Sequence, residues 1–134
     1  AGKPSFDLAE NEIESGIGIH GEPGRHRIPM ASADEITDQL LDPIVKDLDL
    51  EGGEKVIVLV NGMGGTPISE LYIMYGHVAE RLADLNVEIS RSLVGSYITS
   101  LEMQGASITV LKADDEMVEL FDAPVSTAAY RKGM

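Results

Sequence analysis

The sequence contains no cysteine and few basic residues, and both features exclude classes of function. Without cysteine there is no disulfide framework, no thiolate nucleophile and no cysteine-ligated metal site, and nothing indicates an oxidising compartment. Lysine and arginine number 10 against 23 aspartates and glutamates, and the formal net charge of −13 repels nucleic-acid phosphates and anionic lipid headgroups. We therefore expect a cytoplasmic protein with neither a nucleic acid nor a membrane as partner.

Long apolar runs and targeting signals are missing too. No window approaches the roughly 18 apolar residues of a membrane span, and the opening "AGKPSFDLAENEIE" lacks the basic start and apolar core of a signal peptide. The mixture of Pro, Ser and charge in this opening suggests that it continues from an upstream part of a protein. With 134 residues, 43% of them hydrophobic, the chain is expected to form one domain, residues 1–134.

Two long amphipathic helices and several strands are expected along the chain. Ser32 and Glu35 have the spacing of a capping box at a helix start, and Pro43 should kink or divide that helix. The apolar run "KVIVLV" from Lys55 is typical of a buried strand, and Pro67 can begin the second long helix. The remaining segments are expected as strands at 12–20, 87–97 and 106–112, a helical turn at 99–105, a short helix before Pro124, turns at 21–30 and a tail at 125–134.

This order of elements predicts the fold class. Strands that alternate with helices favour α/β, while the close spacing of the last two strands allows an antiparallel pair. We therefore expect a two-layer sandwich with a mixed β-sheet and the two long helices on one face.

A glycine-rich turn, "NGMGGT" at 61–66, follows the buried strand and precedes a helix. Backbone amides in that position can hold an anion. However, no Lys-Ser or Lys-Thr follows, so this is not a P-loop, and the glycine spacing is not that of a dinucleotide-binding turn. A tight turn without a ligand is the favoured reading, and an anion site is the alternative.

The three histidines share no spacing typical of a metal site, and the carboxylates form no calcium-binding loop pattern. His26 and His77 are expected at the surface, without partners. His20 stands among glycines in "GIGIHGEPG", where a strand is expected to end and a loop to begin. A lone histidine is more often structural, but a neutral imidazole can also act as a base or as a nucleophile toward a carbonyl.

Four blocks occur in the order "GIGIHGEPGR", "VLVNGMGGTPISELYIMY", "RSLVGSYITSLEMQGASITVLKADDE" and "LFDAPV". Together they resemble the dihydroxyacetone-binding subunit of the dihydroxyacetone kinase family. The resemblance covers nearly the whole chain but matches only the C-terminal half of that subunit. It implies that the N-terminal half, which supplies the remaining substrate contacts in the family, is not part of this sequence.

The resemblance makes His20 the expected catalytic residue, which binds dihydroxyacetone covalently as a hemiaminal before phosphoryl transfer. It implies no cofactor in this chain, because the phosphoryl donor (ADP or ATP with Mg) is carried by a partner subunit or domain. The expected partners are dihydroxyacetone and a nucleotide-binding kinase subunit, with a homodimer in the full-length protein. A phosphotransferase-system-dependent enzyme is favoured. The alternatives are an ATP-dependent kinase of dihydroxyacetone or a related ketose, and a non-catalytic regulator that binds dihydroxyacetone.

Overall fold

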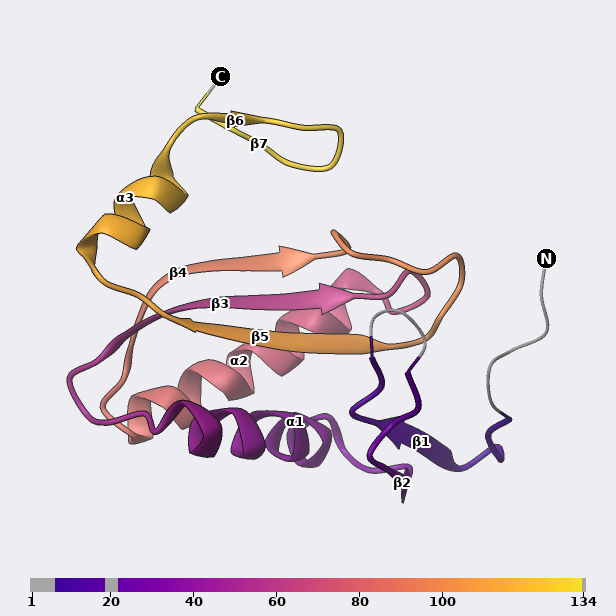
Figure 1. Ribbon diagram of the computed structural model, residues 1–134. Helices are drawn as coiled ribbons and strands as arrows, with labels where there is room; N and C mark the ends of the chain where they lie inside the picture. The colour runs from indigo at the N-terminus through magenta and orange to yellow at the C-terminus, as the bar shows by residue number, and fades with distance from the viewer. Residues whose placement is uncertain (1–6, 19–21, 134) are drawn as a thin grey trace.

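A three-stranded mixed sheet forms the centre of the molecule. The computed structural model describes residues 7–18 and 22–133. The sheet consists of β3 (Lys55–Gly62), β4 (Glu88–Gly95) and β5 (Ala106–Lys112) in the order β4-β3-β5. Strand β3 pairs in parallel with β4 and antiparallel with β5, so the expected mixed sheet is confirmed (Figure 1). The last two strands do run in opposite directions, but they flank β3 instead of pairing with each other.

Two long helices, α1 (Ala33–Leu48) and α2 (Ile68–Asp84), cover one face of this sheet (Figure 1). Alternate β3 side chains point into the core between the layers, and Val56, Val58 and Val60 are fully buried there. The helices contribute the other side of this core, with Leu41, Leu71, Met74, Val78 and Leu82. The two-layer α/β sandwich predicted from the sequence is therefore the observed fold.

The start of α1 follows the capping-box prediction. Ser32 Oγ accepts a hydrogen bond from the backbone N–H of Glu35, and the Glu35 carboxylate accepts one from the backbone N–H of Ser32. Pro43 lies inside the helix but does not divide it. Proline has no backbone N–H, so the carbonyl of Gln39 loses its helical hydrogen bond. Pro43 and Gln39 are both exposed, and water can therefore solvate that carbonyl.

Two short hairpins were not expected. Strands β1 (Glu12–Ser15) and β2 (His26–Pro29) pair antiparallel, although 21–30 was expected to contain only turns. Strands β6 (Val125–Ser126) and β7 (Arg131–Lys132) likewise pair where a tail was expected. Strand β1 falls within the strand expected at 12–20, whereas β2, β6 and β7 are too short to show a period of two and have no local sequence signal.

The C-terminal part contains a helix that was expected and a loop that was not. Helix α3 (Asp115–Asp122) ends before Pro124, as predicted. The expected helical turn at 99–105 is wrong, because this segment is an irregular loop between β4 and β5. The Asp122 carboxylate accepts hydrogen bonds from Arg91 and Lys132, and these contacts hold its pKa well below the usual range. They fasten the end of α3 and the β6–β7 hairpin to β4.

A Val58→Asp substitution tests the central position of β3. Val58 is fully buried, so the new carboxylate would have no partner in the core and the domain should not fold. Thr109→Asp is the matched control, because Thr109 lies in the neighbouring strand β5 and is exposed. We expect the control to keep a cooperative thermal transition near that of the wild type. An unchanged melting temperature for Val58→Asp would mean that the strand assignment is wrong.

Candidate functional site

The loop that contains His20 connects the two strands of the N-terminal hairpin. His20, with Ile19 and Gly21, lies outside the described residues. Its chain neighbours are described, and they are joined by backbone hydrogen bonds. The N–H of Gly18 donates to the carbonyl of Glu22 at 3.0 Å, and the N–H of Arg25 donates to the carbonyl of Ser15 at 2.8 Å. The loop is thus closed by hydrogen bonds on both sides of the candidate residue.

A carboxylate from β1 also holds this loop. Glu14 Oε1 accepts a hydrogen bond from the backbone N–H of Gly24 at 3.1 Å, and Glu14 Oε2 accepts one from Arg27 Nε at 3.0 Å. The Glu14 side chain is only 10% exposed. The sequence analysis did not identify Glu14. Prediction of β2 as a strand would have identified it, because the β1–β2 register places Arg27 opposite Glu14.

Gly18 and Gly24, on either side of His20 in the sequence, lie close to carboxylates. A Cβ atom at Gly18 would lie 2.0 Å from Glu22 Oε2, and one at Gly24 would lie 2.7 Å from Glu14 Oε1. At these positions the missing side chain leaves room for carboxylates of the hairpin itself. Packing within the hairpin therefore accounts for glycine at both positions.

The glycine-rich turn at 61–66 is joined to the loop at 96–105. The N–H groups of Met63 and Gly65 donate to the carbonyls of Gly105 and Met103, and Thr66 Oγ1 donates to the Gly105 carbonyl at 2.8 Å. These two amides are therefore already paired within the chain. That supports the favoured reading of a tight turn over the anion site.

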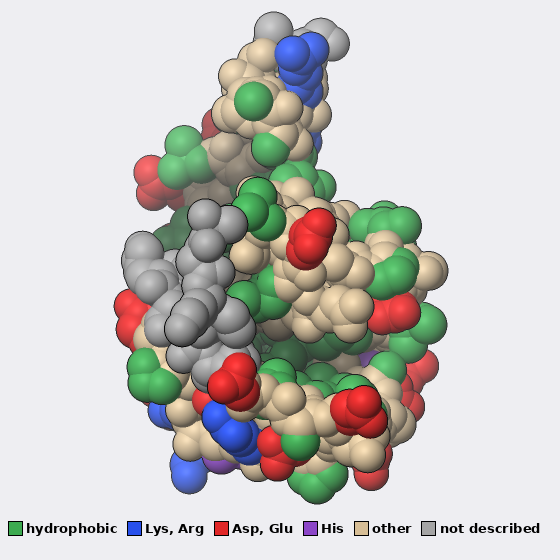
Figure 2. Space-filling model, turned by 90° about the vertical axis from the view of Figure 1, so that its right-hand side faces the viewer, with side chains coloured by type: hydrophobic (Ala, Val, Ile, Leu, Met, Phe, Trp, Pro, Cys, Tyr) green, Lys and Arg blue, Asp and Glu red, His purple; other side chains and the backbone are tan. Residues whose placement is uncertain are grey.

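Asn61, at the end of β3, fixes the first part of the same loop. Its side chain is buried, and its Oδ1 accepts hydrogen bonds from the backbone N–H groups of Tyr97 and Ile98, both at 2.9 Å. Its Nδ2 donates to the Ile98 carbonyl at 2.8 Å. Both loops lie at the end of the sheet that faces the viewer in Figure 2, where hydrophobic side chains surround a hollow.

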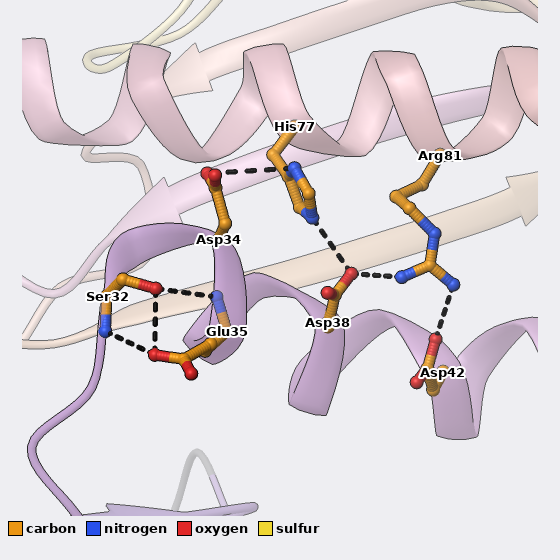
Figure 3. Close-up of polar contacts among 7 residues, drawn as sticks. All are labelled: Ser32, Asp34, Glu35, Asp38, Asp42, His77 and Arg81. Carbon is orange, nitrogen blue, oxygen red and sulfur yellow. Dashed lines mark hydrogen bonds and ion pairs between the residues drawn. The ribbon is translucent and has the colours of Figure 1, made fainter.

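His77 has partners, contrary to the expectation from the sequence. Its ring is 16% exposed, with Nε2 2.9 Å from Asp38 Oδ1 and Nδ1 3.6 Å from Asp34 Oδ1. Arg81, one turn further along α2, contacts Asp38 and Asp42 (Figure 3). These contacts hold the pKa of Asp38 below its usual value, with the His77 hydrogen bond as the largest cause. The network joins α1 to α2 and has a structural role.

Other candidate features among the described residues do not form a site. His26 lies in β2 and is exposed, as expected. No group of three potential metal ligands occurs in the described part of the chain.

An open groove of about 650 Å³ lies beside the hairpin, where Arg25 faces Asp42, Lys46 and Asp47 of α1. Its mixed charges favour neither an anion nor a cation. No described helix has the length and apolarity needed to span a membrane.

Comparison with known proteins gives the family. The model of the Dak1 domain matches residues 1–129. The chain belongs to the Dak1 family. This membership agrees with the resemblance seen in the motif around His20 and in the three blocks that follow it.

The relatives that this chain resembles are longer than the chain. It is 43% identical to the "PEP-dependent dihydroxyacetone kinase, dihydroxyacetone-binding subunit DhaK" of Escherichia coli, over 99% of this chain but 44% of that protein. It is 39% identical to the human "Triokinase/FMN cyclase", over 96% of this chain and 23% of that protein. Among solved structures, a "Dihydroxyacetone kinase operon co-activator Dha-DhaQ" matches with a TM-score of 0.84 and 31% identity, over 91% of this chain and 38% of that one. The chain thus spans less than half the length of these relatives.

An Asp38→Asn substitution tests the contact between the two helices. Because the pKa of Asp38 is lowered in the folded state, its charge stabilises the fold above the ordinary aspartate pKa, and this contribution is lost as the pH falls. At pH 7 we expect Asp38→Asn to lower the free energy of unfolding by about 0.5–1 kcal/mol, the range of partly exposed ion pairs. The difference from the wild type should shrink below about pH 4.

The matched control for this prediction is Asp34→Asn. Asp34 also faces His77, but at 3.6 Å and with 66% of its side chain exposed, so its removal should have a smaller effect. Urea unfolding of the three proteins at pH 7 and at pH 3 measures these differences. Equal losses for Asp34→Asn and Asp38→Asn, or a loss for Asp38→Asn that does not depend on pH, would contradict the assignment.

Proposed function

We propose that this chain is part of a dihydroxyacetone kinase and that His20 binds dihydroxyacetone covalently. The observation that carries the proposal is the 43% identity, over 99% of the chain, to a subunit whose name states that it binds dihydroxyacetone. The "GIGIHGEPG" motif supports His20 as the residue, and backbone hydrogen bonds join the described residues on either side of it.

The chemistry is the addition of a ring nitrogen to a ketone. The unprotonated nitrogen of His20 forms a bond to the carbonyl carbon, and the π electrons of the C=O bond move to oxygen. That oxygen gains a proton through solvent, and the second ring nitrogen loses one. The product is a neutral hemiaminal that contains every atom of dihydroxyacetone. The fixed substrate then presents a terminal hydroxyl for phosphoryl transfer, which gives dihydroxyacetone phosphate.

This chemistry would also give the site its selectivity. Glycerol has hydroxyl groups at the corresponding positions but no carbonyl, so it cannot form the hemiaminal and is rejected by its chemistry. Other ketoses retain the reacting group. The choice among them would depend on residues around the rest of the substrate, and we expect those residues in the N-terminal half of the full-length protein.

The phosphoryl donor would come from a nucleotide-binding partner subunit that carries ADP or ATP with Mg. The sequence has no P-loop, and the Met63 and Gly65 amides of the glycine-rich turn are already hydrogen-bonded. The name "PEP-dependent" of the Escherichia coli relative favours the phosphotransferase-system type over an ATP-dependent kinase. A homodimer of the full-length protein completes the proposed assembly.

A regulator that binds dihydroxyacetone without phosphorylating it is the second candidate. Its specific support is the TM-score of 0.84 and the 31% identity to the operon co-activator. A covalent histidine would serve either role, so the presence of His20 does not separate them. A measurement of turnover separates them.

Mass spectrometry of the full-length protein tests the covalent residue. Dihydroxyacetone should increase the mass of the wild type by one intact molecule, with no water lost, under conditions that preserve the hemiaminal. His20→Ala and His20→Asn should both abolish the adduct, because neither side chain has a nitrogen basic enough to add. Adduct formation should also decline below roughly pH 6, as the free imidazole becomes protonated. An adduct that survives in His20→Ala, or that forms with glycerol, would rule out the proposal.

A turnover assay separates the kinase from the regulator. The full-length protein, mixed with its nucleotide-binding partner and a phosphoryl donor, should produce dihydroxyacetone phosphate if it is the enzyme. The 134-residue chain alone with the same partner should fold but produce none, because the substrate site lacks its other half. No turnover by the full-length protein would favour the regulator, and turnover by the short chain would refute the predicted division of the site.

A further inference from the structure

We infer that Glu14 is a positioning residue for His20, because Glu14 precedes the histidine in the sequence and its carboxylate contacts described residues that follow it. This inference rests on the function proposed above and adds a second residue to the same site. Glu14 belongs to β1 and precedes the loop, while its hydrogen-bond partners Gly24 and Arg27 follow His20 in the sequence. The carboxylate therefore joins the two ends of the segment that contains His20.

The geometry of the hairpin directs this carboxylate toward the loop. Arg27 lies opposite Glu14 in the β1–β2 register, and its Nε donates to one carboxylate oxygen at 3.0 Å. This contact leaves the other oxygen to accept the Gly24 N–H at 3.1 Å. A hydrogen bond to an ionised acceptor is stronger than one between neutral groups, and 90% burial of the side chain protects it from water.

The hairpin gains from such a contact because its strands are short. Its strands contain four residues each, and an isolated two-stranded hairpin is marginally stable at best. Fixing the connecting loop costs conformational entropy for each residue that is ordered. A nucleophile that must meet a ketone in one orientation gains from a loop ordered before the substrate arrives. Gly24 fits this role, since a Cβ there would lie 2.7 Å from Glu14 Oε1.

Glu12 provides a matched control on the same strand. Its carboxylate lies 4.0 Å from Arg27 Nη1 and accepts a hydrogen bond from the N–H of Ala9, outside the loop. Its side chain is 39% exposed, against 10% for Glu14. Glu12→Ala therefore removes a carboxylate near Arg27 without removing a contact to the His20 loop.

The experiment measures adduct formation in the full-length protein as a function of dihydroxyacetone concentration. Glu14→Ala should raise the half-saturating concentration about tenfold, as expected for loss of one hydrogen bond to a charged group. Glu14→Gln keeps an oxygen that can accept the Gly24 N–H, so it should restore the wild-type value to within about threefold. Glu12→Ala should stay within about twofold of the wild type. Melting temperatures are measured for all four proteins.

The outcomes separate this inference from the proposal on which it rests. Absence of any adduct in the wild type would overturn both. An adduct that depends on His20 but forms equally well in Glu14→Ala would overturn the positioning role alone. Equal losses in Glu14→Ala and Glu14→Gln, in parallel with their melting temperatures, would show a purely structural residue and also overturn it. Rescue by glutamine, with Glu12→Ala unaffected, supports the inference.

Discussion

The structure depends on the pairing of β3 with strands on both of its edges. Because β3 is central, its alternate valines must be buried under the helices, and their burial supplies much of the free energy that holds the two layers together. The same pairing fixes what happens at the end of the strand. Asn61 and the glycine-rich turn leave β3 beside the loop that joins β4 to β5, and the two segments hydrogen-bond to each other. One end of the sheet is thereby held in a defined arrangement.

The candidate site lies in a part of the chain with much weaker support. The N-terminal hairpin has two strands of four residues, and its loop is held by backbone hydrogen bonds and by the carboxylate of Glu14. The proposed covalent mechanism would suit this arrangement, since a carbon–nitrogen bond would itself fix the substrate and fewer side chains would be needed to orient it. The proposal that a partner brings the phosphoryl donor takes its support from the net charge of −13 and from the paired amides of Met63 and Gly65.

The predictable parts of the fold are those with local signals. The capping box at Ser32, the apolar run of β3 and the helix that begins after Pro67 each carry their pattern within a few neighbouring residues. The missed parts depend on distant contacts. Strand β2 exists because it pairs with β1, and the loop at 99–105 is shaped by hydrogen bonds to residues about 40 positions earlier. The sequence does carry a weak indication of the partners of His77. Asp34, Asp38 and Asp42 follow one another at helical spacing in α1, and His77 and Arg81 do so in α2.

The candidate site was less predictable from the sequence than the fold. The motif and the family resemblance predict His20, because a single histidine among glycines does not itself specify chemistry. Glu14 was missed because its role requires the register of a hairpin that the sequence did not predict.

The most direct test of the central claim is a ¹³C NMR spectrum of dihydroxyacetone labelled at its carbonyl carbon and bound to the full-length protein. The account predicts that the bound signal moves from the ketone region to that of a saturated carbon bonded to oxygen and nitrogen, and that His20→Ala abolishes this signal. A bound ketone signal in the wild type, or a saturated-carbon signal that persists in His20→Ala, would contradict it.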